Sequence, residues 1–197
     1  SFGGLEIGYQ YRNLDHKGDF VYERKNNATG LFELVTDFSS EVNLRRAIHA
    51  AYAQFDAVYE KWNFGAGLRV EQMERDLSLK DKSGTIDQDY KYDFTKLFPS
   101  VNIVYNINEN SNLKLAYSKR IERTTTFKMN PFPEREHSET LEQGDPNLRP
   151  ELVDQIELGV SHKNTNGDAL FSTLYYRKVD HLINRVNTVY NDTILNR

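Results

Sequence analysis

The chain has 197 residues, of which 38% are hydrophobic, and it contains 12 Tyr, 11 Phe and 1 Trp. This combination suits a β-protein that spreads its apolar area over many strands, and it is unusual for a disordered chain. The formal net charge of −4 argues against a nucleic-acid binder that relies on bulk electrostatics, and the lack of cysteine excludes disulfide frameworks, zinc ribbons and thiol nucleophiles.

A mean hydropathy of −0.71, without an apolar run near the length of a membrane-spanning helix, excludes helical membrane insertion. Tilted membrane strands stay possible, because each needs only about ten residues with every second one apolar.

Period-2 alternation of apolar and polar residues is the main signal along the chain. In chain order it predicts strands over residues 5–12, 19–25, 42–56, 62–72, 101–106, 112–122, 154–163 and 169–179. The alternation is strict in five of these and weaker in 19–25, 42–56 and 169–179. The alanines of residues 41–59 also favour a helix. We expect a strand there, since Tyr52, Phe55 and Tyr59 form no helical stripe with Ile48.

The connections between these strands are of two kinds. Short polar turns are expected at 56–61, 106–111 and 164–168, and long charged segments at 73–92 and 123–153. Long loops at one end and tight turns at the other are typical of outer-membrane barrels. The strict strands of ten or eleven residues also match the roughly 9–11 residues that cross a bilayer at a tilt. Aromatic residues near the expected strand ends suit an interfacial girdle: Trp62, Tyr92, Phe94, Phe98, Tyr105 and Tyr117.

The polar faces of the strands carry both signs of charge together with several glycines. A strand face exposed to bulk solvent gains nothing from repeated glycine, which weakens strands. A watery lumen whose wall is contacted from inside explains the mixture better. We therefore expect the apolar faces to meet lipid, with Leu68, Leu115 and Leu158 pointing outward.

Several segments resemble the barrel of TonB-dependent receptors, and most closely the outer-membrane β-barrel family common in Bacteroidetes. The similarity spans roughly residues 38–183. It rests on the ordered segments AAYAQF, KWNFGAGLRVEQ, LFPSVNIVYNINENSNLKLAYSKRIER, MNPF, EQGDPNLRPE and IELGV. The stretch RIERTTTFKMNPF departs from the family, which more often has proline soon after the arginine pair.

This resemblance implies an all-β, antiparallel, up-and-down transmembrane β-barrel, of which residues 1–197 supply about eight or nine strands. It implies further a location in the bacterial outer membrane, and a plug domain, TonB and a small ligand as partners. The plug and the barrel's C-terminal end are expected outside this stretch, which opens and stops without an obvious terminal element. In this family, GDPNLRPE is the proline-braced return from an external loop into the next strand.

Six charged residues of the polar faces and the loop mouth are candidate ligand contacts: Arg69, Glu71, Arg120, Glu122, Arg123 and Glu157. A solvated rim, or salt bridges from the wall to a plug, explains the same residues. A loose set of possible metal ligands at Glu134, Glu136, His137 and Glu139 is better explained as a charged external loop, because a metal site needs fixed geometry and a supporting shell.

No nucleophile elbow, phosphate loop or metal-protease motif is present in the sequence, so we expect neither enzyme activity nor a cofactor. The function that the resemblance implies is ligand capture and TonB-dependent uptake. Two alternatives stay open: a soluble β-barrel or sandwich that binds a small ligand, and an outer-membrane barrel with a structural or adhesive role.

Overall fold

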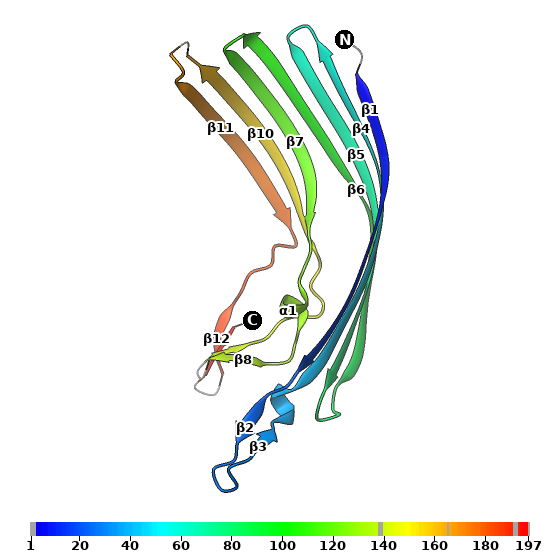
Figure 1. Ribbon diagram of the computed structural model, residues 1–197, viewed down its shortest axis with the longest axis vertical. Coiled ribbons are helices and arrows are strands. Elements are labelled where there is room, and N and C mark those ends of the chain that lie inside the picture. Colours follow the sequence, from blue (N-terminus) through cyan, green and yellow to red (C-terminus); the bar gives the residue numbers. More distant parts are fainter. Residues whose placement is uncertain (1–2, 138–139, 165, 191–192, 197) are drawn as a thin grey trace.

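The main element of the structure is one curved antiparallel sheet of seven strands in the order β1-β4-β5-β6-β7-β10-β11 (Figure 1). The computed structural model describes residues 3–137, 140–164, 166–190 and 193–196. The strands of the sheet are β1 (Gly4–Phe20), β4 (Ser40–Tyr59), β5 (Trp62–Asp81), β6 (Asp87–Asn108), β7 (Ser111–Glu122), β10 (Glu151–Lys163) and β11 (Ala169–Asp180). The all-β, antiparallel prediction is confirmed.

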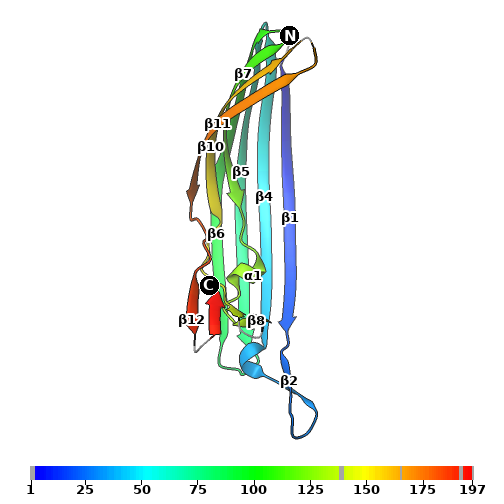
Figure 2. The ribbon, with the colours of Figure 1, turned by 90° about the vertical axis from the view of Figure 1, so that its left-hand side faces the viewer.

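The remaining elements gather at one end of the sheet. They are β2 (Glu23–Lys25), β3 (Phe32–Leu34), η1 (Thr36–Phe38), α1 (Thr126–Met129), β8 (Glu134–His137), β9 (Thr140–Glu142), β12 (Asn187–Tyr190) and β13 (Thr193–Asn196). β2 and β3 form a hairpin, and β12, β13, β9 and β8 form a small sheet in which β13 and β9 run parallel. α1 and β8 lie on the concave side of the main sheet, hereafter its inner face (Figures 1 and 2). Within the described residues no helix is long and apolar enough to cross a membrane.

The two ends of the main sheet differ as the sequence predicts. Three tight turns, at residues 60–61, 109–110 and 164–168, join the strands at one end. The connection between β1 and β4, the tips of β5 and β6, and the connection from β7 to β10 lie at the other end (Figure 1). From the usual sidedness of outer-membrane barrels, we expect the tight turns to face the periplasm and the longer connections to face the cell exterior.

The outer face near the tight turns is apolar and uncovered. Leu68, Leu115 and Leu158 are 47%, 47% and 43% exposed, respectively. In a water-soluble body these side chains would pack together, so their outward placement supports the expected contact with lipid. We call this band of outward apolar residues the lipid belt.

Polarity inverts part-way along the long strands while the pleat continues unbroken. On β5 the outward residues up to Val70 are apolar, whereas from Gln72 they are polar. The inward residues change in the opposite sense: Met73, Leu77 and Leu79 are buried. Strands of about 20 residues at roughly 3.4 Å per residue exceed an apolar band about 25 Å tall. The distal halves therefore stand beyond the membrane, where water lies outside and a packed core lies inside.

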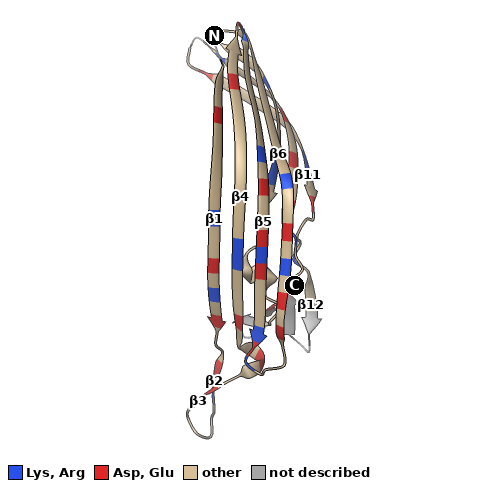
Figure 3. Ribbon diagram, turned by 90° about the vertical axis from the view of Figure 1, so that its right-hand side faces the viewer, with Lys and Arg blue, Asp and Glu red and all other residues tan. Residues whose placement is uncertain are grey.

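The edge of the lipid belt crosses the sheet obliquely. The last outward apolar residue is Tyr11 on β1, which lies level with Thr95 of β6 through the strand register. On β7 it is Tyr117, which pairs with Val101. The edge thus shifts by six residues along β6 over the four strand-to-strand steps from β1 to β7, between one and two residues per step. Strands tilted by 35–45° in a flat membrane produce a shift of this kind. Charged residues on β1, β4 and β5 accordingly concentrate in the distal halves (Figure 3).

The external loop after β7 packs onto the inner face of the distal halves. Met129 and Phe132 of this loop join a buried cluster with Val42, Leu44 and Leu77. A second buried cluster lies nearer the membrane and consists of Ile48, Met73, Phe94, Phe98 and Leu152. The protein therefore builds its core from strand residues that face inward and loop residues that fold back on them.

Three sequence-based predictions are wrong in detail. Residues 73–92 are not a loop, because β5 and β6 continue through them to a turn at 82–86. Residues 19–25 are not one strand of the main sheet, because β1 itself runs to Phe20 and β2 pairs only with β3. Tyr92, Phe94 and Phe98 face inward and do not belong to a girdle. In each case the strand continues beyond the lipid belt with polar residues outward and apolar residues inward, and this reversal was interpreted as the end of the strand.

The glycines on the inner face make room for side chains of the neighbouring strands. At Gly8 an added Cβ would lie 2.3 Å from the ring of Tyr52, whose hydroxyl donates to Glu6 at 3.0 Å. At Gly67 it would lie 2.7 Å from Ser100 Oγ. These glycines make room for neighbouring side chains, so they do not by themselves require an occupant of the lumen.

Replacing Leu68 by Arg is expected to destabilise the protein by about 2–4 kcal/mol, the magnitude measured for arginine at the bilayer midplane on a barrel's lipid face. The matched control is Ser78→Arg, on the same face of β5 but beyond the lipid belt and opposite Asp89. It is expected to change stability by less than about 1 kcal/mol. Denaturant unfolding of the protein in lipid vesicles measures both, and equal destabilisation would contradict the assigned edge of the belt.

Because the chain has no native cysteine, single cysteines report sidedness directly. A membrane-impermeant thiol reagent on intact cells is expected to label Ser83→Cys, at the tip of the β5–β6 hairpin. It should reach Glu109→Cys and Asn166→Cys only after the outer membrane has been permeabilised. Equal labelling of all three in intact cells would reverse or abolish the assigned orientation.

Candidate functional site

A buried carboxylate marks the inner face just beyond the lipid belt. Arg69 and Glu71 are two residues apart on β5, so both point inward. The Glu71 side chain is only 2% exposed. Its Oε2 accepts from Arg69 Nε at 3.3 Å and Nη2 at 3.1 Å, and its Oε1 accepts from Arg123 Nη2. Arg69 Nη2 also donates to Gln10 Oε1 on β1 at 3.0 Å. One carboxylate thus joins the barrel wall to the start of the external loop.

Arg123 reaches Glu71 because β7 parts from β6. Pairing of the two strands ends at Ser100 and Ser118, whereas β6 continues to Asp87. Beyond that point the end of β7 leans over the inner face, and Ile121 packs against the cluster of buried residues around Phe98.

Cations outnumber carboxylates around Glu71. Arg46 lies directly opposite Arg75 in the β4–β5 register, and Lys96 lies opposite Glu71. Burial lowers the pKa of Arg46, and the charges of Arg123 and Arg12 lower it further, against the opposing effect of Glu71. Burial likewise lowers the pKa of Arg75, which the facing Arg46 reinforces. The arginines stay charged at neutral pH, so their crowding creates a region of positive potential.

A cavity of about 380 Å³ lies beside Glu71 on the inner face. It is lined by Gln10, Arg12, Ile48, Arg69, Glu71, Phe98, Lys119, Arg120, Ile121 and Arg123. Lys119 already pairs with Asp154 at 3.3 Å. The remaining charges are four guanidinium groups and one carboxylate. We call this the arginine cavity.

Arg75 fastens the external loop above the arginine cavity. Its Nη1 donates to the carbonyl oxygen of Leu148 at 2.9 Å and to Thr124 Oγ1 at 3.3 Å, and it contacts Met129 Sδ at 3.0 Å. Its guanidinium lies 5.1 Å from the ring centre of Tyr92, a cation–π contact. Gly144 lets the loop close tightly, because a Cβ there would lie 2.3 Å from the carbonyl oxygen of Lys128.

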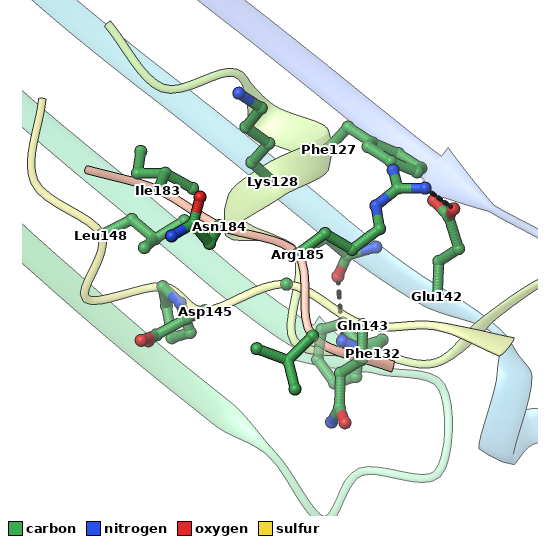
Figure 4. Close-up of a pocket in the computed structure, with 14 residues that line it drawn as sticks. Phe127, Lys128, Phe132, Glu142, Gln143, Asp145, Leu148, Ile183, Asn184 and Arg185 are labelled. Atoms are coloured by element: carbon green, nitrogen blue, oxygen red, sulfur yellow. Dashed lines mark hydrogen bonds and ion pairs between the residues drawn. The ribbon is translucent and has the colours of Figure 1, made fainter. Parts of the chain in front are cut away.

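A second, larger cavity of about 630 Å³ lies within the external loops (Figure 4). Phe127, Phe132 and Leu148 line it on the side of the β7–β10 loop, and residues 183–186 after β11 close the other side. Arg185 Nη1 bonds Glu142 Oε1 at 2.9 Å and so links the two segments. This loop cavity lies beyond the lipid belt, whereas the arginine cavity lies at its edge, because Arg69 and Gln10 are level with the last outward apolar residues of their strands.

Comparison with known proteins identifies the class to which this architecture belongs. A model of the outer membrane protein beta-barrel family matches residues 1–197, the full length of the chain. The chain belongs to this family. It is therefore an outer-membrane β-barrel protein, located in the bacterial outer membrane. The search of curated proteins finds no match.

Family membership and the uncovered lipid belt together overturn the alternative of a soluble β-barrel or sandwich. A soluble barrel turns its apolar strand faces inward, whereas in this outer-membrane barrel they point outward. The predicted contact with outer-membrane lipid follows directly from the same two findings.

Four of the six sequence-predicted site residues meet in the arginine cavity: Arg69, Glu71, Arg120 and Arg123. Glu157 lies elsewhere, in a lower inner cavity, 3.9 Å from Lys114. Glu122 is exposed at the end of β7, level with Glu151. Binding by any of the six stays a prediction.

Sequence reasoning missed Arg12, Arg46 and Arg75 of this outer-membrane barrel. Arg75 lies in the segment that was assigned to a loop, and Arg46 gains meaning only when the register sets it opposite Arg75. The alternation of Met73, Arg75, Leu77 and Leu79 was the available signal, since it continues the pleat with reversed polarity. The possible metal ligands at 134–139 have side chains outside the described residues, and in the described part of the chain no group of three or more His, Asp or Glu is placed to hold a metal.

Glu71→Gln is expected to loosen the external loop. Losing the carboxylate leaves Arg69 and Arg123 without their shared partner, at a cost of no more than about 3 kcal/mol because both remain partly exposed. The readout is trypsin cleavage after Lys128, which is exposed and is followed by buried Met129. Glu74→Gln, on the outer face of the same strand, is the control and should cleave at the wild-type rate. Unchanged cleavage in Glu71→Gln would remove Glu71 as the anchor of the loop.

Proposed function

We propose that this outer-membrane barrel is a receptor that captures a ligand on its inner face and passes it across the outer membrane by TonB-dependent uptake. The observation that carries the proposal is the ion pair between Glu71 on the wall and Arg123 at the start of the external loop. It lines a cavity on the inner face at the edge of the lipid belt, directly below the external loop.

The charge arrangement supports a binding role over a purely structural one. Removing charged groups from water is costly, and apolar residues of similar volume stabilise a core equally well or better. The apolar clusters of the distal halves already supply such packing. A wall that also buries the carboxylate of Glu71 beside two arginines carries a cost that ligand binding explains.

The external loops supply the second part of the proposed capture site. The loop cavity combines aromatic and aliphatic side chains with amides and charged groups, a composition typical of ligand pockets. Because Arg75 and Arg123 both hold the β7–β10 loop, movement of this loop would alter both cavities together. In the proposed mechanism the barrel residues bind and position the ligand without chemical change, and a plug moved through TonB opens the path.

The test is uptake by living cells. Cells with the intact gene, cells that lack it, and cells treated with a protonophore are each grown in a medium containing a defined mixture of metabolites. Mass spectrometry then measures which components disappear. The expected result is that at least one component is depleted only by energised cells that carry the gene.

Arg123→Gln should reduce that depletion, whereas Arg45→Gln, on the outer face of β4, should not. Identical depletion with and without the gene would overturn the receptor proposal in favour of a structural or adhesive barrel. If depletion requires the gene but continues in the presence of the protonophore, the barrel acts as a passive pore. That result would refute the TonB-dependent step.

A further inference from the structure

We propose that the ligand of the arginine cavity is an oxyanion with two or more charged groups, either carboxylates or phosphates, held by Arg12, Arg69, Arg120 and Arg123. This inference deepens the proposed function and rests on it for its biological meaning. It is argued from the charge balance, the free donor capacity, the size of the cavity and its position relative to lipid.

The charge balance requires an anion. Of the four arginines that line the cavity, Arg69 and Arg123 share the single carboxylate of Glu71. No described carboxylate forms an ion pair with Arg12 or Arg120. Arg46, just behind the cavity, is also without an ion pair among the described residues. A ligand with one charge would leave most of this positive potential uncompensated, whereas a di- or trianion matches it.

The unused hydrogen-bond donors of the arginines also favour a ligand that carries several anionic groups. The Arg120 guanidinium donates from Nη2 to the neutral amide oxygen of Gln155 at 2.7 Å, which orients it without neutralising it. The buried Nε atoms of Arg46 and Arg123 have no hydrogen-bond partner in the described part of the chain. Planar guanidinium groups bind carboxylate and phosphate through two parallel hydrogen bonds, so several converging arginines favour a ligand rich in oxygen atoms.

The position of the cavity on the inner face also excludes lipid headgroups as the source of the anionic groups. Lipid headgroups carry phosphate, but the arginine cavity opens on the inner face, whereas lipid contacts the outer face of the same strands. A cavity of about 380 Å³ accommodates a small polyanion and is too small for a folded domain. Phe98 and Ile48 supply an apolar floor that suits the carbon skeleton of an organic acid or ester.

The experiment is isothermal titration of the purified full-length protein in detergent with citrate and with pyrophosphate, which separates the carboxylate source from the phosphate source. Acetate and glucose are the singly charged and neutral comparisons. At least one polyanion is expected to bind, and acetate and glucose are not. Arg12→Gln and Arg120→Gln are the informative variants, because neither leaves a described carboxylate unpaired. Each should weaken binding about tenfold or more, since hydrogen bonds to charged groups are strong.

Arg45→Gln is the matched control, because it removes the same charge from the outer face, where Arg45 pairs with the exposed Asp15 at 3.7 Å. Its affinity should equal that of the wild type. Absence of binding by both polyanions, with Arg12→Gln and Arg120→Gln lowering the thermal stability, would overturn the inference and assign the arginines to acidic residues of the protein's own chain. Binding unaffected by either variant would overturn it as well.

Failure here and failure of the receptor proposal are distinguishable. Polyanion binding without gene-dependent depletion from the medium would keep the site and reject uptake. Gene-dependent depletion of only neutral compounds, with no polyanion binding, would keep uptake and reject the anion.

Discussion

The constraint on which this structure depends is that strands in lipid must keep every backbone group hydrogen-bonded to a neighbouring strand, so the pleat cannot be reset inside the membrane. Once Leu68 points to lipid, every second residue of β5 is committed to the same face for the whole strand. Glu71, Arg75 and Leu79 are thereby committed to the inner face. Beyond the lipid belt the solvent on the outer face changes from hydrocarbon to water. The inner face then has to become the apolar one, and the external loop that folds onto it completes the core.

The arginine cavity lies at this change of solvent. On the membrane side of it the inner face is polar, with small residues that fit between neighbouring side chains, as at Gly8 and Gly67. On the exterior side the inner face is apolar and covered by the loop. Glu71 stands between the two environments, and its ion pairs with Arg69 and Arg123 tie the wall to the loop. In the proposed receptor, a loop anchored by a charge in a cationic cavity would couple the occupancy of that cavity to the position of the loop.

Comparison of prediction and structure shows where sequence reasoning works. Residues 62–70 alternate apolar and polar with one solvent on each side, so the strand and its outward face were predicted correctly. Residues 73–81 alternate just as strictly but with reversed polarity, and the high charge of their outer face resembles a loop. The same reversal led to Tyr92, Phe94 and Phe98 being placed in an interfacial girdle. The turn at Asp145–Leu148 was predicted correctly because proline, glycine and aspartate act locally, whereas the strand predicted from Asp154 begins three residues earlier, at Glu151.

The sequence by itself determined that this protein is built from antiparallel strands, which residues share each strand face, and which strand ends carry tight turns and which carry longer loops. These features depend on the period of two and on local turn chemistry, both of which are written in neighbouring residues. Only the tertiary structure decided that Arg46 faces Arg75, that β7 leaves β6 after Ser118, and that Arg123 therefore reaches Glu71 from 52 positions away. Such contacts depend on register and on the path of a loop across the barrel interior, and neither is encoded in the alternation of a single strand.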